Sequence, residues 1–415
     1  MQRIYSLYGK LLSATALRKA YEQVRRAKGA AGIDRQSLRD FGAQLDNNLQ
    51  TLLLELTNKT YQAQPVRRVE IPKDDGGVRL LGIPSVRDRI VQQALLNILH
   101  PIFDIDFHPS SYGYRPRRSC HDAINKATLF IRRYGRRWVV DMDLSKCFDR
   151  LSHDLIIEGV KRKVTDGGVL SLIRQFLTSG VMVGDKREPS VQGSPQGGVI
   201  SPLLANIYLD AFDQEMKRRG HRIVRYADDI LILCTSRKGA EHALAVATQL
   251  LEQDLQLLVN KDKTHIAHSD DGVKFLGVEI GSAYTRIQVK KVAGFKAKLK
   301  ALTKRNSGLP LRDVIARINP LLRGFANYFK IANSLKVLTA LSKWIRRRLR
   351  AIQLKLWKKP TRLHRRLRQL GVKGRLKFIN MRSWRSANCP LATIAMTNNW
   401  FDEQGFYRLE RAFNT

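Results

Sequence analysis

Two adjacent carboxylates, Asp228 and Asp229, stand out within the stretch RIVRYADDILILC (222–234). Short runs of β-branched and apolar residues flank them, which predicts two strands joined by a turn. Adjacent ionised carboxylates repel each other, so this turn is a costly place for them unless a cation neutralises their charge. Mg²⁺ suits the position because it takes oxygen ligands and commonly binds one or two carboxylates plus substrate phosphates. A solvated Asp-Asp hairpin turn is the ordinary alternative.

A second stretch, RRWVVDMDLSKCFD (136–149), contains further carboxylates. Because side chains alternate across a strand, Asp141 and Asp143 project from the same face. We expect that face to meet the Asp-Asp hairpin, so that two separate strands build one acidic cluster. The structural alternative is that Asp141 or Asp149 simply caps the following turn.

The segments around these carboxylates alternate between helical and extended patterns. The first 60 residues predict mostly helix, interrupted at GAAGID (29–34), where small residues and Asp favour a turn. Interleaved helices and strands are typical of a mixed α and β domain. The predicted helices cover 88–99, 167–178 and 239–257, and the predicted strands cover 137–144 and both arms of the hairpin.

The charge of the chain indicates its kind of partner. A formal charge of +38 over 415 residues favours a polyanion, and nucleic acid is favoured over an anionic membrane surface. The length allows two or more domains. From Gly281 to Pro390 there are 30 Lys or Arg residues and a single acid, Asp313. With so little internal compensation, we expect this segment to bind phosphates, although a solvated charged face is the alternative.

Apolar residues recur at helical spacing inside the basic segment, from Leu341 to Leu356, and arginines fill the positions between them. The pattern predicts a helix that packs on one side and is cationic on the other.

Several classes of protein are disfavoured. No apolar run approaches the roughly 18–20 residues that span a bilayer, and the N-terminus lacks the apolar core of a secretory signal. We therefore expect a cytoplasmic protein, associated with the nucleoid when it acts on DNA. The cysteines are far apart, which argues against a zinc ribbon or a disulfide framework. They are Cys120, Cys147, Cys234 and Cys389.

Six ordered blocks make the chain resemble a bacterial group II intron-encoded reverse transcriptase and maturase, in the compact form without an endonuclease domain. A lone YADD would be weak evidence, but six blocks in order at family-like spacing are specific, and they cover most of the chain. No His/Cys-rich block resembles an HNH endonuclease. The blocks are IPKDDGGVRLLGIPSVRDRIVQQAL (71–95), SSYGYRPRRSCHDAI (110–124), DMDLSKCFDRLSHDLI (141–156), GSPQGGVISPLLANIYL (193–209), RYADDILIL (225–233) and KFLGV (274–278).

The resemblance implies an α+β fold of the right-hand polymerase type. Fingers and palm, with an antiparallel sheet packed by helices, would precede an α-helical thumb. The expected divisions are a mostly helical N-terminal extension (1–65), fingers and palm (66–280), a basic thumb and maturase domain (281–385), and a C-terminal tail (386–415).

The resemblance also assigns roles to particular residues. It implies that Asp143, Asp228 and Asp229 are catalytic and hold two Mg²⁺ ions, with Mn²⁺ able to substitute. Asp143 is preferred to Asp141 because it precedes Phe148 by five positions, as the family's catalytic aspartate precedes its aromatic steric gate, which would exclude a 2′-OH. The remaining roles are nucleotide binding by Lys73, Arg79, Phe148, Gln196, Tyr226 and Ala227, a primer grip of Phe275, Leu276 and Gly277, and nucleic-acid binding by Lys343, Arg346, Arg347, Arg348, Arg350, Lys358, Lys359 and Arg362.

The implied reaction is attack of a primer 3′-OH on the α-phosphate of a dNTP, with two metal ions and loss of pyrophosphate. The implied partners are template RNA or DNA, a DNA primer, dNTPs and group II intron RNA, with no membrane. The sequence leaves the oligomeric state open, including a dimer. One alternative is a domesticated enzyme without an intron, acting in DNA repair or defence. Another is an RNA-binding splicing cofactor only, which the intact carboxylates and Gln196 disfavour.

Overall fold

The computed structural model describes residues 3–72, 77–184 and 186–413. The chain divides into two compact units, an N-terminal unit, Met1–Ser269, and a C-terminal unit, Asp270–Thr415. Within the described residues, no helix has both the length and the apolar character that crossing a bilayer requires.

The N-terminal unit begins with helices that support a small sheet, here called the finger sheet. The helices are α1 (Ala14–Ala27), α2 (Leu38–Ala43), α3 (Leu45–Thr57) and α4 (Val86–Asp104). Serine side chains cap three of these helices, α1, α2 and α4; for example, Ser13 accepts a hydrogen bond from the backbone of Ala16 and Ser85 accepts one from Asp88. The finger sheet has the order β2-β1-β4-β5, with β1 (Val66–Pro72), β2 (Val78–Ile83), β4 (Val181–Val183) and β5 (Lys186–Glu188).

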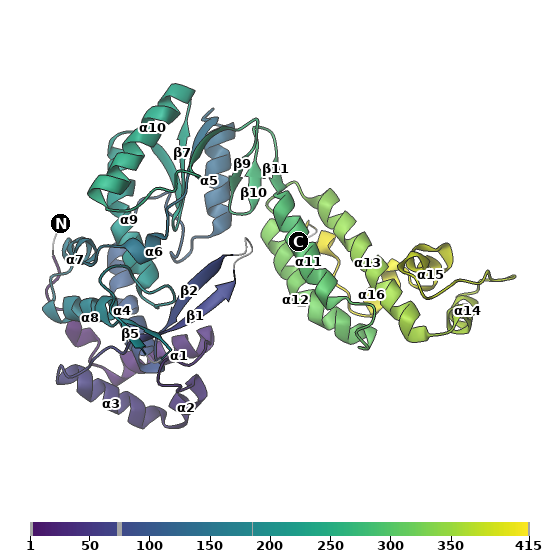
Figure 1. Ribbon diagram of the computed structural model, residues 1–415, viewed down its shortest axis with the longest axis horizontal. Helices are drawn as coiled ribbons and strands as arrows, with labels where there is room; N and C mark the ends of the chain where they lie inside the picture. Colours follow the sequence, from purple (N-terminus) through teal and green to yellow (C-terminus); the bar gives the residue numbers. More distant parts are fainter. Residues whose placement is uncertain (1–2, 73–76, 185, 414–415) are drawn as a thin grey trace. The chain divides into compact units, whose positions relative to one another are not determined.

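A second sheet, the palm sheet, carries the acidic motifs. Its order is β6-β7-β3-β8 and every pairing is antiparallel. Val140, Ile230 and Ile232 join the main core on one face, while Val139 and Leu231 are equally buried on the other. Both faces are thus covered, and β7 lies between α10 and α5 in Figure 1. The strands are β3 (Trp138–Met142), β6 (Arg222–Tyr226), β7 (Asp229–Cys234) and β8 (His265–His268).

The helices around the palm sheet match the expected ones closely. The helix predicted over 167–178 has those bounds, and the one predicted over 239–257 runs as α10 and a following π turn from Arg237 to Asp254. The helix predicted over 88–99 is longer, because Ser85 caps its start and Pro101 is accommodated near its end. The helices are α5 (Cys120–Arg132), α6 (Cys147–Arg150), α7 (His153–Lys161), α8 (Gly167–Thr178), α9 (Ser201–Arg218) and α10 (Arg237–Gln249).

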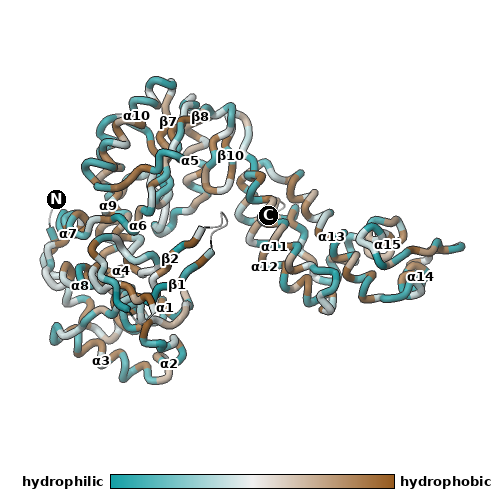
Figure 2. Tube along the Cα trace, in the orientation of Figure 1, coloured by the Kyte–Doolittle hydropathy of each residue, from teal (hydrophilic) through white to brown (hydrophobic). Residues whose placement is uncertain are grey.

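The C-terminal unit is a three-stranded sheet followed by helices. Figure 2 shows apolar and polar positions alternating along α11 to α13, as expected for helices that bury one face. The expected boundary at 280/281 lies inside the small sheet. The elements are β9 (Val273–Phe275), β10 (Val278–Ile280), β11 (Thr285–Ile287), α11 (Val289–Leu302), α12 (Leu311–Phe329), α13 (Leu335–Trp357), α14 (Pro360–Gln369), α15 (Pro390–Ala395) and α16 (Asn398–Glu403).

The predicted α+β class is confirmed. An antiparallel palm sheet packed by helices precedes a helical unit, as the right-hand polymerase fold requires.

Candidate active site

The two adjacent carboxylates lie at the tight turn between β6 and β7. Tyr226 pairs with Asp229, so Ala227 and Asp228 form a two-residue turn. Ala227 has a φ of 58°, a left-handed conformation that costs a residue with a Cβ about 1–2 kcal/mol. Contacts elsewhere must therefore hold this turn in place.

Arg225 supplies one such contact from inside the protein. Its side chain is fully buried, and Nη1 donates hydrogen bonds to the Ala227 carbonyl and to Asn206 Oδ1, each at 3.0 Å. Its Nε and Nη2 donate to the buried Asp213 carboxylate at 2.6–2.9 Å. A bidentate pair of this kind is geometrically specific. Arg225 thus fixes the position of the turn.

The segment 110–113 packs against the same turn. The Tyr112 N–H donates to the Arg225 carbonyl at 2.9 Å, and the Arg225 N–H donates to the Ser110 carbonyl at 2.9 Å. A Cβ on Gly113 would lie 2.3 Å from the Ala227 nitrogen, so only glycine allows this approach. Part of the SSYGY motif therefore supports the turn.

Asp143 comes level with this turn from the neighbouring strand. Asp141 pairs with Leu231 and Met142 with Ile230, so β3 ends beside the start of β7, and Asp143 follows directly. Asp143 Oδ2 accepts a hydrogen bond from Asn260 Nδ2 at 2.9 Å and lies 3.6 Å from Lys263 Nζ. Two separate stretches of chain thus bring their carboxylates to one end of the palm sheet.

The acidic groups perturb one another electrostatically. Burial and then the charge of Asp143 raise the pKa of Asp228. Burial, followed by the charges of Asp228, Asp141 and Asp143, raises the pKa of Asp229 to about 7, against the opposing effect of Lys263. Water reaches part of Asp229, yet the surrounding protein removes much of its hydration. Burial and mutual repulsion therefore disfavour the ionised forms of Asp228 and Asp229.

The residues fit a hard divalent cation only in part as they stand. Across the described ranges 3–72, 77–184 and 186–413, no three His, Cys, Asp or Glu side chains form a ready-made metal site. One oxygen of Asp143 is engaged by Asn260 and Lys263. Mg²⁺ needs only one or two carboxylates together with substrate phosphates. The oxygen donors and the uncompensated charge match that requirement.

A cavity of about 810 Å³ opens beside the carboxylates. Asp143 and Asp228 line it together with Arg79, Phe148 and Gln196, so residues from both sheets converge there. Its volume falls within the range of small-molecule sites. The cavity can accept a charged substrate next to the acidic groups.

The Phe148 ring is braced within this cavity. Tyr114 also lines the space, and its ring meets that of Phe148 edge to face, with centroids 6.4 Å apart. Tyr114 has a φ of 57°, a left-handed conformation. The aromatic pair gives one wall of the cavity a defined shape.

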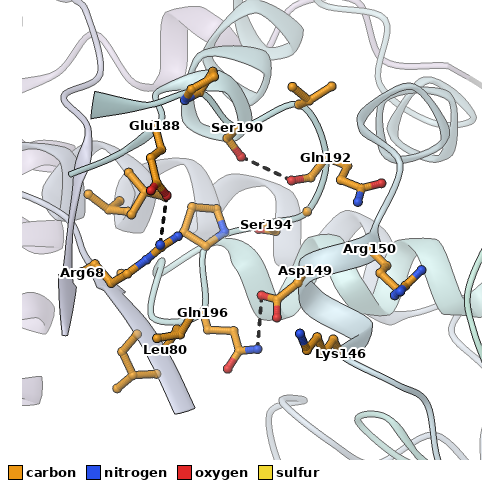
Figure 3. Close-up of a pocket in the computed structure, with 18 residues that line it drawn as sticks. Arg68, Leu80, Lys146, Asp149, Arg150, Glu188, Ser190, Gln192, Ser194 and Gln196 are labelled. Atoms are coloured by element: carbon orange, nitrogen blue, oxygen red, sulfur yellow. Dashed lines mark hydrogen bonds and ion pairs between the residues drawn. The ribbon is translucent and has the colours of Figure 1, made fainter. Parts of the chain in front are cut away.

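The SPQGG loop is packed tightly against the rest of the site. Gly193 has a φ of 86° and an added Cβ would lie 2.8 Å from the Asp149 carbonyl. Gly197 has a φ of 113° and an added Cβ would lie 2.5 Å from the Gly82 carbonyl. Both positions therefore require glycine. Gln196 Nε2 lies 3.4 Å from Asp149 Oδ1 and donates to it (Figure 3).

Figure 3 shows a second hollow of about 520 Å³, which Gln196 and Asp149 also line. Arg68 and Glu188 form an ion pair at 2.9 Å across it. Because Lys146 and Arg150 line both hollows, the two spaces adjoin.

Comparison with known proteins assigns the family. A model of the reverse transcriptase (RNA-dependent DNA polymerase) family matches residues 71–280, which contain every carboxylate of the site. The chain belongs to the reverse transcriptases. A model of the group II intron maturase-specific domain matches residues 292–371 of the same enzyme.

Two curated relatives support this assignment. The reverse transcriptase is 37% identical to protein YkfC of Escherichia coli in an alignment of 325 residues. The match covers 66% of this chain and 85% of that protein. The chain is 28% identical to the group II intron-encoded protein LtrA of Lactococcus lactis over 431 residues, covering 79% of this chain and 71% of LtrA. The predicted family is confirmed, and with it RNA-directed DNA polymerase activity.

Other expected site residues of the reverse transcriptase lie in varied settings. Lys73 lies outside the described residues. Tyr226 is half-buried beside the turn. Phe275 ends β9, and Leu276 and Gly277 form a two-residue turn to β10 with φ of 45° and 82°. The Leu276 carbonyl accepts a hydrogen bond from the Tyr328 hydroxyl at 2.8 Å, which holds this turn on α12.

The structure divides the basic residues of α13 into two groups. Arg346 is buried, with 5% of its side chain exposed, and lies 3.8 Å from Glu410, so it is not placed to bind phosphate as expected. Arg348 lies over the rings of Trp344 and Trp384, and Arg350 donates to the Met396 carbonyl. These three arginines pack the C-terminal unit. The exposed candidates are Lys343 in α13 and Lys358, Lys359 and Arg362 beyond its end, while Arg347 is partly exposed.

Arg225 and Asp213 are functional residues that sequence reasoning missed. Arg225 is one of two arginines in the strand RIVRY, and from the sequence either could be a solvent-facing residue. The one signal was its position two residues before the turn, between apolar neighbours, but its buried partner lies in a distant helix, α9.

Proposed function

We propose that Asp143, Asp228 and Asp229 hold two Mg²⁺ ions and that this site extends a DNA primer with dNTPs on an RNA template. Mn²⁺ would be able to replace Mg²⁺. The observation that carries the proposal is the cavity that Asp143 and Asp228 line together with Arg79 and Gln196. Burial and the neighbouring carboxylates also raise the pKa of Asp229 to about 7, as expected for a site that lacks its cation. Two divalent ions bound there would lower the pKa of the attacking 3′-OH and offset charge on the leaving pyrophosphate.

Some side chains of the site would have to change their protonation or contacts before metal ions bind. Asp229 would lose the proton that its raised pKa favours, and Asp143 would exchange its contact with Lys263 for the ion. Arg225 would keep the turn in place throughout, because its hydrogen bonds are buried and independent of the substrate. Catalysis would then rest on positions that the fold sets in advance.

The cavity would receive the incoming nucleotide. Arg79 would bind the triphosphate, since a guanidinium can donate two parallel hydrogen bonds to phosphate, and Lys73 would add a point charge. Phe148, held edge-on by Tyr114, would collide with a 2′-OH. Gln196, Tyr226 and Ala227 would contact the nucleotide, while Phe275, Leu276 and Gly277 would grip the primer.

We also propose that the C-terminal unit binds group II intron RNA and assists splicing and retrohoming. The match of residues 292–371 to the maturase-specific domain supports this role, as does the description of LtrA as a group II intron-encoded protein. Exposed cations such as Lys343 and Arg362 would contact phosphates, so affinity would fall steeply with added salt.

Two paired assays test these proposals. Primer extension on an RNA template with dNTPs should require Mg²⁺ or Mn²⁺ and stop with EDTA. A splicing assay should use the RNA that flanks the gene, with and without the protein. Extension that persists in EDTA would overturn the metal assignment. Extension without any effect on splicing would overturn the maturase role and favour an intron-free enzyme of repair or defence.

A further inference from the structure

A third hollow, of about 470 Å³, lies on the N-terminal unit away from the carboxylates. Three segments form it: the loop His108–Ser110, the C-terminal part of α5 with the residues that follow, and the chain from the end of α9 into β6. Strand β6 starts at this hollow with Arg222 and reaches the catalytic turn after Tyr226, about 13 Å further on. The hollow is therefore separate from the polymerase site.

Its walls carry positive charge without compensation. Four basic side chains line it, and no Asp or Glu belongs to the lining. Within the part of the chain that the structure describes, none of the four takes part in an ion pair. Elsewhere in this unit, cations do pair, as Lys163 does with Asp106. A concave site lined by one sign of charge favours an anion. The four residues are Lys126, Arg136, Lys217 and Arg222.

Aromatic rings accompany these cations. Phe130 forms part of the floor, and the ring of Tyr134 lies beside it with centroids 6.0 Å apart. Tyr134 lines the hollow and is 55% exposed, so its side chain is accessible to a ligand there. Lys126 Nζ lies 4.9 Å from the Phe130 ring centroid, which places a cation next to the apolar surface.

Two histidines add neutral hydrogen-bonding groups. The Ser110 N–H donates to His108 Nδ1 at 3.0 Å, so the ring proton of a neutral His108 lies on Nε2, which can donate. Burial lowers the pKa of His108, and burial with the nearby His242 lowers that of His221. Both rings thus favour the neutral form.

We propose that this hollow binds a nucleotide unit, with its phosphate among the four cations and its base on the open ring of Tyr134. The volume suits a ligand of that size. Phosphate alone would not need the rings, and an acidic peptide would gain little from an open aromatic face. The same chemistry is offered by a free nucleotide and by one residue of a single-stranded RNA, because both combine a phosphate with a flat base.

The test first measures binding of AMP by calorimetry to the full chain in EDTA. AMP lacks the triphosphate, and removing divalent ions disfavours the polymerase site. The informative variants are Tyr134→Ala and the double variant Lys217→Ala with Arg222→Ala. Tyr134→Phe keeps the ring, and Arg162→Ala with Lys238→Ala removes two exposed cations elsewhere on the unit. No variant touches His108–Ser110, because that segment leads into the support of the catalytic turn.

We expect Tyr134→Ala to weaken AMP binding about fivefold to a hundredfold, in line with the loss of one stacked base. The double variant should weaken it at least tenfold, whereas both controls should bind as the wild type does. Primer extension should be unchanged in all four variants. AMP binding therefore tests the hollow independently of the catalytic proposal, which primer extension tests.

A second measurement separates the two sources. A 12-nucleotide single-stranded RNA containing 4-thiouridine is cross-linked by ultraviolet light, and the cross-linked peptides are mapped. Cross-links within 126–136 that Tyr134→Ala abolishes would identify an RNA strand, and AMP binding without them would identify a free nucleotide. The proposal is overturned if neither occurs, if AMP binding ignores the variants, or if hexaglutamate binds the hollow and AMP does not.

Discussion

Like charges gather both at the catalytic turn and in helix α13, but their surroundings differ. At the turn, carboxylates accumulate without enough cations, and the pKa of Asp229 rises to about 7. In α13, neighbouring arginines find partners inside their own unit, as Arg346 does near Glu410 and Arg348 does between two tryptophans. A run of like charges therefore indicates a ligand only where the folded protein places no compensating groups next to those charges. Four expected outcomes test this difference.

The largest effect should come from the uncompensated charges. Replacing Asp228 by Asn should reduce primer extension at least about a hundredfold, because a metal-binding oxygen and its charge are lost together. RNA binding should stay near the wild-type level, since the exposed cations are untouched. Primer extension and filter binding on the same preparation provide the measurement. Near-normal extension by this variant or by Asp229→Asn would defeat the catalytic assignment.

The next largest effect should come from the one charge at the turn that is compensated. Asp213→Asn leaves Arg225 fully buried without its counter-charge, which should lower the free energy of unfolding by about 3–5 kcal/mol. Urea unfolding of the variant checks this value. The matched control is Glu158→Gln, which breaks an exposed pair with Lys161 and should leave the midpoint unchanged. Equal midpoints for the two variants would contradict the buried clamp.

A smaller contrast should appear within α13. Arg346→Ala should lower the stability of the C-terminal unit by about 1–3 kcal/mol, because it removes the cation beside the half-buried Glu410, which keeps its hydrogen bond from Ser342. Lys343→Ala, on the exposed face, should keep stability but weaken RNA binding and reduce the salt slope by about one. Thermal unfolding and salt titrations distinguish them. If Lys343→Ala lowered stability and Arg346→Ala weakened RNA binding instead, the division of α13 into packing and RNA-binding residues would be wrong.

The smallest effect concerns pH. The pKa of Asp229 is about 7 in the folded protein and roughly 3.9 when unfolded, so the folded state favours the protonated group. Without metal, the folded protein should lose stability as the pH rises from about 4 through about 7. In EDTA, the melting temperature should therefore fall more between pH 5 and pH 8 for the wild type than for Asp229→Asn. An equal fall in both proteins would show that ionisation of Asp229 does not cause the loss of stability.

Local pattern was enough to predict much of the site. Short runs of β-branched and apolar residues located the strands on both sides of Asp228 and Asp229, and the order of the blocks indicated the family that the comparisons assign. The helix α8 was predicted with its observed bounds because its apolar spacing is regular. Such features depend on neighbours within a few positions, which the sequence displays directly.

Long-range contacts decided the rest. The pairing of β3 with β7 brings Asp143 to the end of the palm sheet that carries the turn, and the burial of Arg225 depends on Asp213 in α9. The sequence could not divide the arginines of α13, because their partners, such as Glu410, lie far along the chain. The basic hollow likewise combines three separate segments. Residue types and local periodicity are written in the chain, but which charges are compensated depends on distances that only folding creates.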